Sequence, residues 1–286
     1  MSEKKARVKV ISSMLIYGSI GLFVRYIPLP SAVIAMVRGF IGAPFVLLVM
    51  LLAGKGKELK STRERLLPLC LSGIVMGFNW ILLFEAYRYT SVATATLCYY
   101  MAPIFIVAAS PFLFKEKLGK RKIICIAVAL LGMVLVSGSG TETGSVKGVI
   151  FALGAALLYA TVVSINKLCG NVSAYARTFV QLASAAVVLM PYNLLTGNLN
   201  EINPGLAGGL VLLIVGIIHT GFAYYLYFGS VDALSAQSLA ILSYIDPVTA
   251  VLLSALILRE PLTMPVILGA VLILGSALIS ELPEKA

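Results

Sequence analysis

The sequence of 286 residues is 60% hydrophobic and only 12% charged, with a mean hydropathy of +1.00. Soluble globular domains are about 45–50% apolar and about 25% charged, so the composition excludes that class and predicts an integral membrane protein. The formal net charge is +10. The basic residues nevertheless cluster in short connectors between apolar stretches, as in cytoplasmic loops, which argues against a nucleic-acid partner.

The apolar stretches are long enough to cross a membrane, which takes about 20 mostly apolar residues. In chain order, the ten candidate spans are residues 8–26, 31–53, 67–87, 91–114, 122–139, 147–166, 173–194, 206–228, 234–257 and 262–280. The basic start MSEKKARVKV resembles a signal peptide. The apolar run behind it is too long and has no convincing cleavage site, so we expect it to be retained as the first span.

The sequence has four cysteines, Cys70, Cys98, Cys125 and Cys169. Their spacing suggests no pairs, and three of the four lie in apolar segments. We interpret them as small buried hydrophobic side chains rather than as disulfides or metal ligands. The sequence predicts no metal site and no cofactor.

The basic residues also predict the orientation. With the N-terminus in the cytoplasm, 17 Lys and Arg residues fall on the cytoplasmic side and four, Arg25, Arg88, Lys147 and Arg259, fall outside. Because Lys and Arg are enriched in cytoplasmic loops, both termini are expected in the cytoplasm and the chain in the cytoplasmic membrane. Arg38 is the basic residue left within a span.

The chain repeats itself at an offset near 144. Matched pairs are Gly77 and Gly221, Phe78 and Phe222, Ser91 and Ser235, Tyr100 and Tyr244, Pro103 and Pro247, and Glu116 and Glu260; nearer the start of each half, Tyr17 pairs with Tyr159 and Arg25 with Lys167 at 142, and Arg38 with Gln181 at 143. This pattern predicts two five-span units, residues 1–140 and 141–286. Because five is odd, the second unit enters the membrane inverted, an architecture that many transporters use.

Proline interrupts the fourth span in LCYYMAPIF and the ninth in ILSYIDPVT. Pro103 and Pro247 lie roughly 18–20 Å into a hydrocarbon core of about 30 Å, near its midplane. Each removes a backbone donor and frees one carbonyl, on Tyr99 and Ser243. In lipid these groups must be satisfied by protein or by a wet cavity. Two interpretations remain, a central polar cavity flanked by both spans or kinks healed by neighbouring helices, and the shared depth favours the cavity.

Each unit has a broken span, then KEKL or REPLT, then a last span containing glycine. In this order the units resemble the EamA domain of the drug/metabolite transporter superfamily, twice over the whole chain. The resemblance implies an all-α membrane protein with ten transmembrane helices in two inverted five-helix repeats. It also implies a central cavity lined mainly by the first four spans of each repeat, with the last span of each at the periphery. Members export amino acids, metabolites or toxic compounds, and some import, so the resemblance leaves the substrate open.

Asp246 is the carboxylate predicted near the midplane, where a charge costs about 2.5–3.5 kcal/mol on insertion scales. It could bind a substrate ammonium or carry a coupling proton; alternatively, it satisfies the backbone broken beside Pro247. Ala102 stands at the matching place in the first unit. A symmetric scaffold needs no unpaired central charge, which puts the two interpretations level.

Arg38 remains charged within its span and must face a cavity, a carboxylate or carbonyl groups. Its guanidinium fork suits a substrate carboxylate, while a structural pair is the alternative. In the third span, Asn79 and Trp80 lie deep, and Trp80, the single tryptophan, could form an aromatic wall that holds a cation. Glu85 is expected to pair locally with Arg88.

Further polar candidates lie deep in other spans. His219, the single histidine, could relay protons but could equally make one interhelical hydrogen bond. The remaining cavity candidates are Tyr17, Tyr99, Tyr100, Tyr244, Gln181 and Ser243, with the repeat-paired Tyr100 and Tyr244 preferred.

Other patterns predict packing. Gly148, Ala152, Ala156 and Ala160 recur every four residues and give a smooth helix face, as does GIVMG at 73–77. Glu116 and Glu260 are expected to cap the starts of the fifth and tenth helices.

The favoured function is a secondary transporter of a small polar metabolite by alternating access, with amino acids or related compounds as substrates and export as the direction. No nucleotide-binding loop of the form G-x-x-x-x-G-K-[ST] occurs, so direct driving by ATP is not expected. A proton gradient would then supply the energy, unless the protein is a facilitator. Import of another metabolite is the alternative in direction. A membrane-embedded enzyme is a weaker alternative, because the sequence lacks a set of catalytic or metal-binding residues such as H-E-x-x-H. A non-transporting subunit is a further alternative. The expected partners are a small-molecule substrate and membrane lipid.

Overall fold

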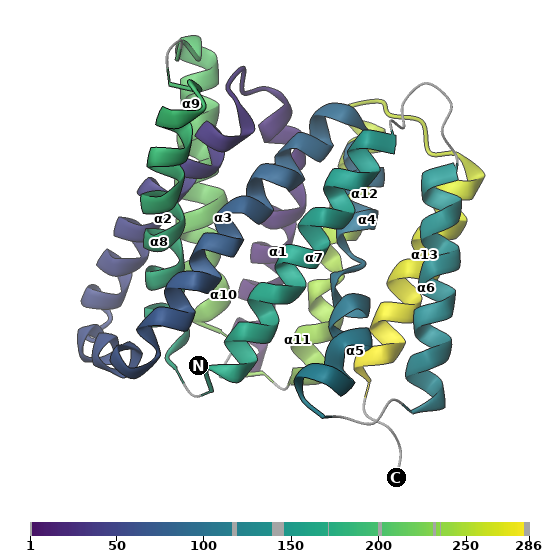
Figure 1. The fold of residues 1–286 in the computed structure, drawn as a ribbon, viewed down its shortest axis with the longest axis horizontal. Coiled ribbons are helices and arrows are strands. Elements are labelled where there is room, and N and C mark those ends of the chain that lie inside the picture. The colour runs from purple at the N-terminus through teal and green to yellow at the C-terminus, as the bar shows by residue number, and fades with distance from the viewer. Residues whose placement is uncertain are drawn as a thin grey trace.

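The computed structural model describes residues 2–115, 119–138, 146–170, 172–199, 202–230, 233–234 and 236–282. These residues form a bundle of helices (Figure 1). The elements are α1 (Glu3–Arg25), α2 (Ser31–Leu52), η1 (Gly56–Arg65), α3 (Leu66–Tyr89), α4 (Val92–Tyr99), α5 (Ala102–Leu113), α6 (Lys120–Gly138), α7 (Val146–Leu168), α8 (Ala174–Leu195), α9 (Gly205–Ile214), η2 (Val215–Phe222), α10 (Ala223–Phe228), α11 (Ala236–Ser243), α12 (Ile245–Leu256) and α13 (Met264–Glu281).

The outer surface of the bundle suits lipid. Seven helical segments are long and apolar enough to cross a membrane: Glu3–Arg25, Ser31–Leu52, Gly56–Tyr89, Val92–Leu113, Val146–Leu168, Ala174–Leu195 and Gly205–Phe228. Ile241–Leu256 and Met264–Ser280 are shorter apolar helices. Large apolar side chains such as Leu52, Phe112 and Leu195 are almost fully exposed. Together with the apolar helical segments, the large number of exposed apolar side chains marks a membrane-facing surface, so the protein is a multi-pass membrane protein.

Both predicted helix breaks are present. α4 ends at Tyr99, and α5 begins at Ala102 with Pro103 in its first turn. α11 ends at Ser243, and α12 begins at Ile245 with Pro247 in its first turn. Proline is tolerated in a first turn because the N–H groups there have no intrahelical acceptor. The chain therefore resolves each proline by starting a new helix.

The eighth predicted span differs from expectation in its middle. Val215–Phe222, labelled η2, is wound as a π-helix between α9 and α10. Added Cβ atoms at Gly216 and Gly221 would meet Ile41 at 2.6 Å and Phe45 at 2.6 Å, so α2 packs directly against this segment. No residue type specifies a π-helix, which is why the apolar pattern predicts an ordinary span here. Such segments often mark functional sites.

The repeat is visible in the lengths of the helices. α1 and α7 both have 23 residues, and α2 and α8 both have 22. The broken spans match as well, with eight residues in α4 and α11 and 12 in α5 and α12. Lys115 (φ 57°) and Arg259 (φ 56°) lie 144 residues apart in the same left-handed conformation, which is uncommon outside glycine. The predicted boundary near residue 140 falls outside the described residues and remains a prediction.

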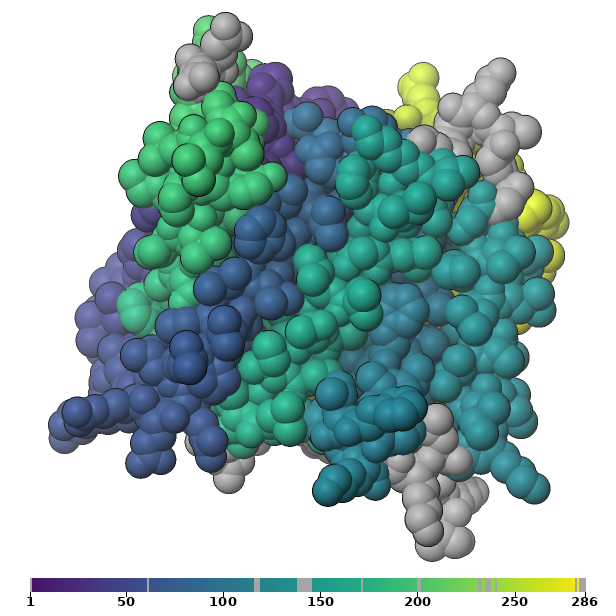
Figure 2. All heavy atoms as spheres, viewed as in Figure 1, coloured from purple at the N-terminus to yellow at the C-terminus, as the bar shows by residue number. Residues whose placement is uncertain are grey.

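The two halves interlock. In Figure 1, α1 rises from the lower end, which we call the N-terminal end, whereas α7 descends from the opposite end. α1 packs against α10, α11 and α12 of the second half, and α7 packs against α3, α4 and α5 of the first. Figure 2 shows α3 and α7 closely packed on the viewed face. Each half thus places its first helix in the other half.

The predicted small-residue faces lie at these contacts. Gly148, Ala152 and Ala156 are buried in α7, and a Cβ on Gly148 would meet Thr90 at 2.7 Å. In α3, a Cβ on Gly77 would meet Ala185 of α8 at 3.3 Å. All four cysteines are free, and only Cys70 is not fully buried, as predicted.

α6 and α13 lie side by side at the edge of the bundle, on the right in Figure 1. Their backbones touch, since a Cβ on Gly269 would lie 2.6 Å from the Gly132 carbonyl oxygen. Their peripheral position agrees with the expectation for the last span of each repeat.

Candidate functional site

A cavity of about 590 Å³ lies among helices of both halves. Both broken spans line it, through Tyr100, Pro103 and Asp246 among others. The sequence-predicted residues on its wall are Tyr17, Arg38, Trp80, Tyr99, Tyr100, Gln181, Ser243, Tyr244 and Asp246. Neither α6 nor α13 contributes to the lining. Of the two interpretations of the prolines, the structure therefore favours the cavity over healed kinks.

The cavity reaches one end of the bundle. At the N-terminal end its lining includes Ala174, the first residue of α8, and Phe228, the last of α10, both partly exposed. Toward the opposite end the lining stops at buried side chains, among them Thr96, which is 3% exposed. We call the end of the cavity with these partly exposed residues its mouth, and the end covered by buried side chains its roof.

Arg38 holds a buried positive charge on the cavity wall. The residue is 6% exposed, and its Nε donates to Thr220 Oγ1 at 2.6 Å. The guanidinium carbon lies 4.3 Å from the Trp80 ring centroid and 5.9 Å from that of Phe84. Among the described residues no carboxylate pairs with Arg38, and its terminal nitrogens have no hydrogen-bond partner. The two aromatic faces offset part of the cost of burying the charge.

Thr220, which the sequence does not single out, is positioned by the π-helix. Its hydroxyl donates to the Val215 carbonyl at 3.1 Å, five residues back, and accepts from Arg38. A Cβ on Gly42 would collide with the Thr220 side chain, so glycine is needed there for α2 to approach. The glycines of α2 and of residues 215–222 are the signal that could have indicated this close contact.

Asp246 is held by the other half of the chain. Tyr100 Oη lies 3.0 Å from Asp246 Oδ2 and 3.4 Å from the Ser243 carbonyl, the carbonyl that Pro247 frees. The Tyr100 and Tyr244 rings lie 6.2 Å apart. The Ser243 hydroxyl donates to its own helix at Leu239, 2.8 Å away. The Tyr100 hydroxyl thus lies within reach of both the freed Ser243 carbonyl and the Asp246 carboxylate, and Asp246 still lines the cavity.

Aromatic rings complete the walls. Tyr17 packs edge-on against Tyr224 with centroids 5.7 Å apart, and Tyr99 lies 5.5 Å from Tyr159. All four rings line the cavity. The site therefore combines two cations, Arg38 and Arg177, and one carboxylate, Asp246, with many aromatic side chains.

Gln181 lines the cavity but is tied to other side chains. Its Nε2 donates to Ser72 Oγ at 2.6 Å and to Asn166 Oδ1 at 2.8 Å, which joins α3, α7 and α8 near the mouth. Its repeat partner, Arg38, has no such ties at its terminal nitrogens.

Asn79 and His219 do not line the cavity. Asn79 donates to the Ala155 carbonyl at 2.6 Å and joins α3 to α7. His219 is 1% exposed, and its Nε2 lies 3.0 Å from Ser19 Oγ of α1. For His219 the geometry matches the interhelical hydrogen bond, the second of the two interpretations of this residue.

Glu85 and Arg88 form the predicted local ion pair, with Oε1 and Nε 4.0 Å apart. Arg88 also donates to the Leu29 carbonyl and so ties the end of α3 to the connection between α1 and α2.

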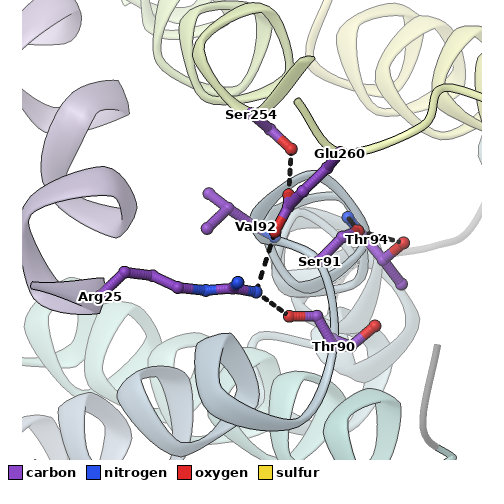
Figure 3. A network of polar contacts seen from close by, with 7 residues as sticks. All are labelled: Arg25, Thr90, Ser91, Val92, Thr94, Ser254 and Glu260. Atoms are coloured by element: carbon purple, nitrogen blue, oxygen red, sulfur yellow. Dashed lines mark hydrogen bonds and ion pairs between the residues drawn. The ribbon is translucent and has the colours of Figure 1, made fainter. Parts of the chain in front are cut away.

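The prediction that Glu260 caps the start of the tenth helix, α13, is wrong. α13 begins at Met264, after Thr263, and Glu260 instead accepts from Val92 N at 2.9 Å, at the first residue of α4. The same carboxylate pairs with Arg25 at 2.9 Å and accepts from Ser254 (Figure 3). The left-handed Arg259 turns the chain back before α13 starts, which aims Glu260 at another helix. Glu116 lies outside the described residues.

Residues 5–138 and residues 146–281 each match the EamA-like transporter family. The chain belongs to the EamA-like transporter family. "Uncharacterized transporter YxxF" of Bacillus subtilis (strain 168) is 32% identical over 255 residues, which cover 88% of this chain and 81% of that protein. "Uncharacterized inner membrane transporter YicL" of Salmonella typhimurium is 24% identical over 294 residues, covering 99% and 97%.

A crystal structure titled "Crystal structure of protein" superposes with a TM-score of 0.68 over 96% of both chains, at 21% identity, and shows that the fold is shared. Together with the apolar helices, family membership makes this EamA protein a multi-pass membrane transporter.

Proposed function

We propose that this EamA protein is a secondary transporter that exports amino acids or related zwitterionic metabolites across the cytoplasmic membrane by alternating access. The observation that carries the proposal is Arg38, whose buried guanidinium lines the cavity with its terminal nitrogens unpartnered among the described residues. A buried charge without a protein counter-charge is expensive, so a ligand that supplies a carboxylate gains more than it would in water.

Arg38 is oriented for such a ligand. Thr220 occupies Nε and Trp80 supports the guanidinium face, so the terminal nitrogens remain for a bidentate contact with carboxylate oxygens. The contacts with Thr220 and Trp80 fix the orientation of the guanidinium group but do not neutralise its charge. The geometry for binding a carboxylate therefore exists before the substrate arrives.

Asp246 supplies the opposite charge. Arg38 and Asp246 line one cavity but form no ion pair within 4.0 Å among the described residues, so a zwitterion can contact both. The volume of about 590 Å³ fits small-molecule sites, and the aromatic walls suit an apolar side chain. Asp246 is also the carboxyl group in the cavity lining, which makes it the candidate for a coupling proton.

The proposed membrane arrangement has ten crossings, with the N-terminal end of the bundle in the cytoplasm. The nine apolar helical segments, together with α6, supply ten helical passages when each broken span counts once. The excess of Lys and Arg in the connectors at that end supports the orientation. A cavity with its mouth there would load from the cytoplasm, as export requires.

The arrangement is testable by labelling in sealed cells. Cysteine introduced by Lys60→Cys is expected to be protected from an impermeant maleimide added outside, whereas Ile202→Cys is expected to react. Both positions are exposed. Labelling of both from the same side would contradict the ten crossings.

Binding is testable through Trp80, the single tryptophan, which stacks on Arg38. Amino acids added to the purified protein are expected to change its emission in a saturable way, whereas simple amines of equal size are not. In proteoliposomes the same amino acids should exchange, and a pH gradient should drive net flux if a proton is coupled. If none of these solutes alters the emission or crosses the bilayer, the proposed substrate class is wrong.

A further inference from the structure

The contacts of Glu260 join three elements at the closed end of the cavity. Arg25 ends α1, Val92 begins α4, and Glu260 lies in the connection between α12 and α13. Arg25 additionally donates to the Thr90 carbonyl at 2.6 Å, at the end of α3 (Figure 3). We call Arg25, Val92, Ser254 and Glu260 the outer cluster. It links the first half of the chain to the second.

The outer cluster lies directly above the cavity roof. Thr96, the roof residue of α4, follows Val92 by one helical turn, and Ala250 of α12 precedes Ser254 by one turn. A Cβ on Gly21 of α1 would lie 2.6 Å from Val92 Cγ1, so α1 also presses on the start of α4. Glu260 therefore connects α1, α4 and the end of α12 directly above the roof, through Arg25, Val92 and Ser254.

The chemistry of the cluster allows two states. Glu260 is 9% exposed on its side chain and accepts from a cation, a hydroxyl and a helix N-terminal N–H, which are strong charge-assisted contacts. Removing one partner leaves a buried charge poorly compensated. Exposed to water, the carboxylate, Arg25 and the end of α4 would each be solvated. The contacts of Glu260 are thus strong while water is excluded, and water can replace them once the cluster is exposed. Contacts of this kind suit a closure that forms and breaks.

We propose that the outer cluster is a latch that holds the cavity closed toward the outside and that must break for the cavity to open there. The inference rests on the proposed alternating access, and it assigns Glu260 and Arg25 as positioning residues of that cycle. Neither residue touches the cavity, so neither is expected to contact the substrate.

The test is thiol accessibility of the roof, which requires no substrate. Thr96→Cys in sealed, right-side-out vesicles should react slowly with an impermeant maleimide, and the chain without this change gives the background of the native cysteines. Adding Glu260→Gln, which keeps an acceptor for Val92 but removes the charge, should raise the labelling rate at least tenfold. Arg25→Gln should do the same.

The matched control is Glu85→Gln. It removes one carboxylate at the same end of the molecule, but its ion pair with Arg88 lies within α3 and involves neither α4 nor α12. This change should leave Thr96→Cys labelling as slow as before. The exchanged pair Arg25→Glu with Glu260→Arg should return labelling part of the way toward the original rate.

Unchanged labelling in both single variants, with Trp80 emission and the elution profile of a folded protein retained, would overturn the latch. If Glu260→Gln does not fold, Arg25→Gln alone decides, and its failure to raise labelling has the same meaning. A lack of solute flux would instead refute the proposed function and leave the accessibility result standing.

Discussion

The two broken spans share a backbone plan but differ in their chemistry. α4–α5 and α11–α12 have equal lengths, and each restarts with a proline in the new first turn. Both breaks line the cavity, the first with the uncharged Ala102 and the second with Asp246, which is held by Tyr100. The two halves thus share the same broken-span backbone, and Asp246 in place of alanine gives only the second copy a charge at the break.

Arg38 and Gln181 differ in the same way. Gln181 is tied to Ser72 and Asn166, while the terminal nitrogens of Arg38 have no partner among the described residues. Arg38 of the first half and Asp246 of the second therefore bring opposite charges to the cavity, while Arg177 of the second half, which also lines it, donates to the Gly170 and Val172 carbonyls. The difference between matched positions, rather than the repeat, carries the expected specificity for a zwitterion.

The largest effect is expected at Gly18, where α1 crosses the second break. A side chain there would collide with the Asp246 carbonyl and lie 2.7 Å from Thr249 Cβ. Gly18→Val should therefore abolish recovery of folded protein, measured by size-exclusion elution of detergent extracts. Gly275→Val is the control, because a Cβ at Gly275 meets no atom within 4 Å. Equal recovery of the two variants would mean that α1 does not need this close approach.

Arg38→Gln should weaken binding of amino acids roughly ten- to hundredfold, since hydrogen bonds to charged groups contribute about 1.5–3 kcal/mol. Arg38→Lys keeps the charge but loses the fork and should weaken carboxylate-bearing ligands more than amines. Trp80 emission measures both. Equal losses for the two ligand classes would favour a structural role for Arg38.

Asp246→Asn should remove the pH dependence of transport and leave exchange of bound substrate measurable. The reason is that an amide cannot carry the proton that a carboxyl can. His219→Gln is the control, since His219 lies outside the cavity, and it should retain the pH dependence. Flux in proteoliposomes at several pH values measures both variants. A pH profile unchanged by Asp246→Asn would remove this residue as the proton site.

The smallest effect concerns Lys167, the repeat partner of Arg25. Its Nζ lies 3.9 Å from the Phe114 ring at the N-terminal end. If the two ends work alternately, Lys167→Gln should shift Thr96→Cys labelling from outside a fewfold in the direction opposite to Arg25→Gln. A shift in the same direction would show that the two ends are not related as the repeat predicts.

The sequence by itself predicted the helical spans, the breaks and the free cysteines. Hydropathy suffices for the spans because lipid requires long apolar segments with internally satisfied backbones, and proline acts locally wherever it stands. The matched offset of Pro103 and Pro247 further indicated a shared depth and hence a cavity, which the structure contains.

Only the tertiary structure decided the partners within that frame. Arg38 meets Thr220 across 182 residues, Tyr100 meets Asp246 across 146, and Val92 meets Glu260 across 168. Such pairings depend on helix rotation, on the π-helix around Thr220 and on a left-handed turn at Arg259. Apolar periodicity is nearly uniform around helices that face lipid, so it cannot specify these rotations, and packing against the other half of the chain sets them.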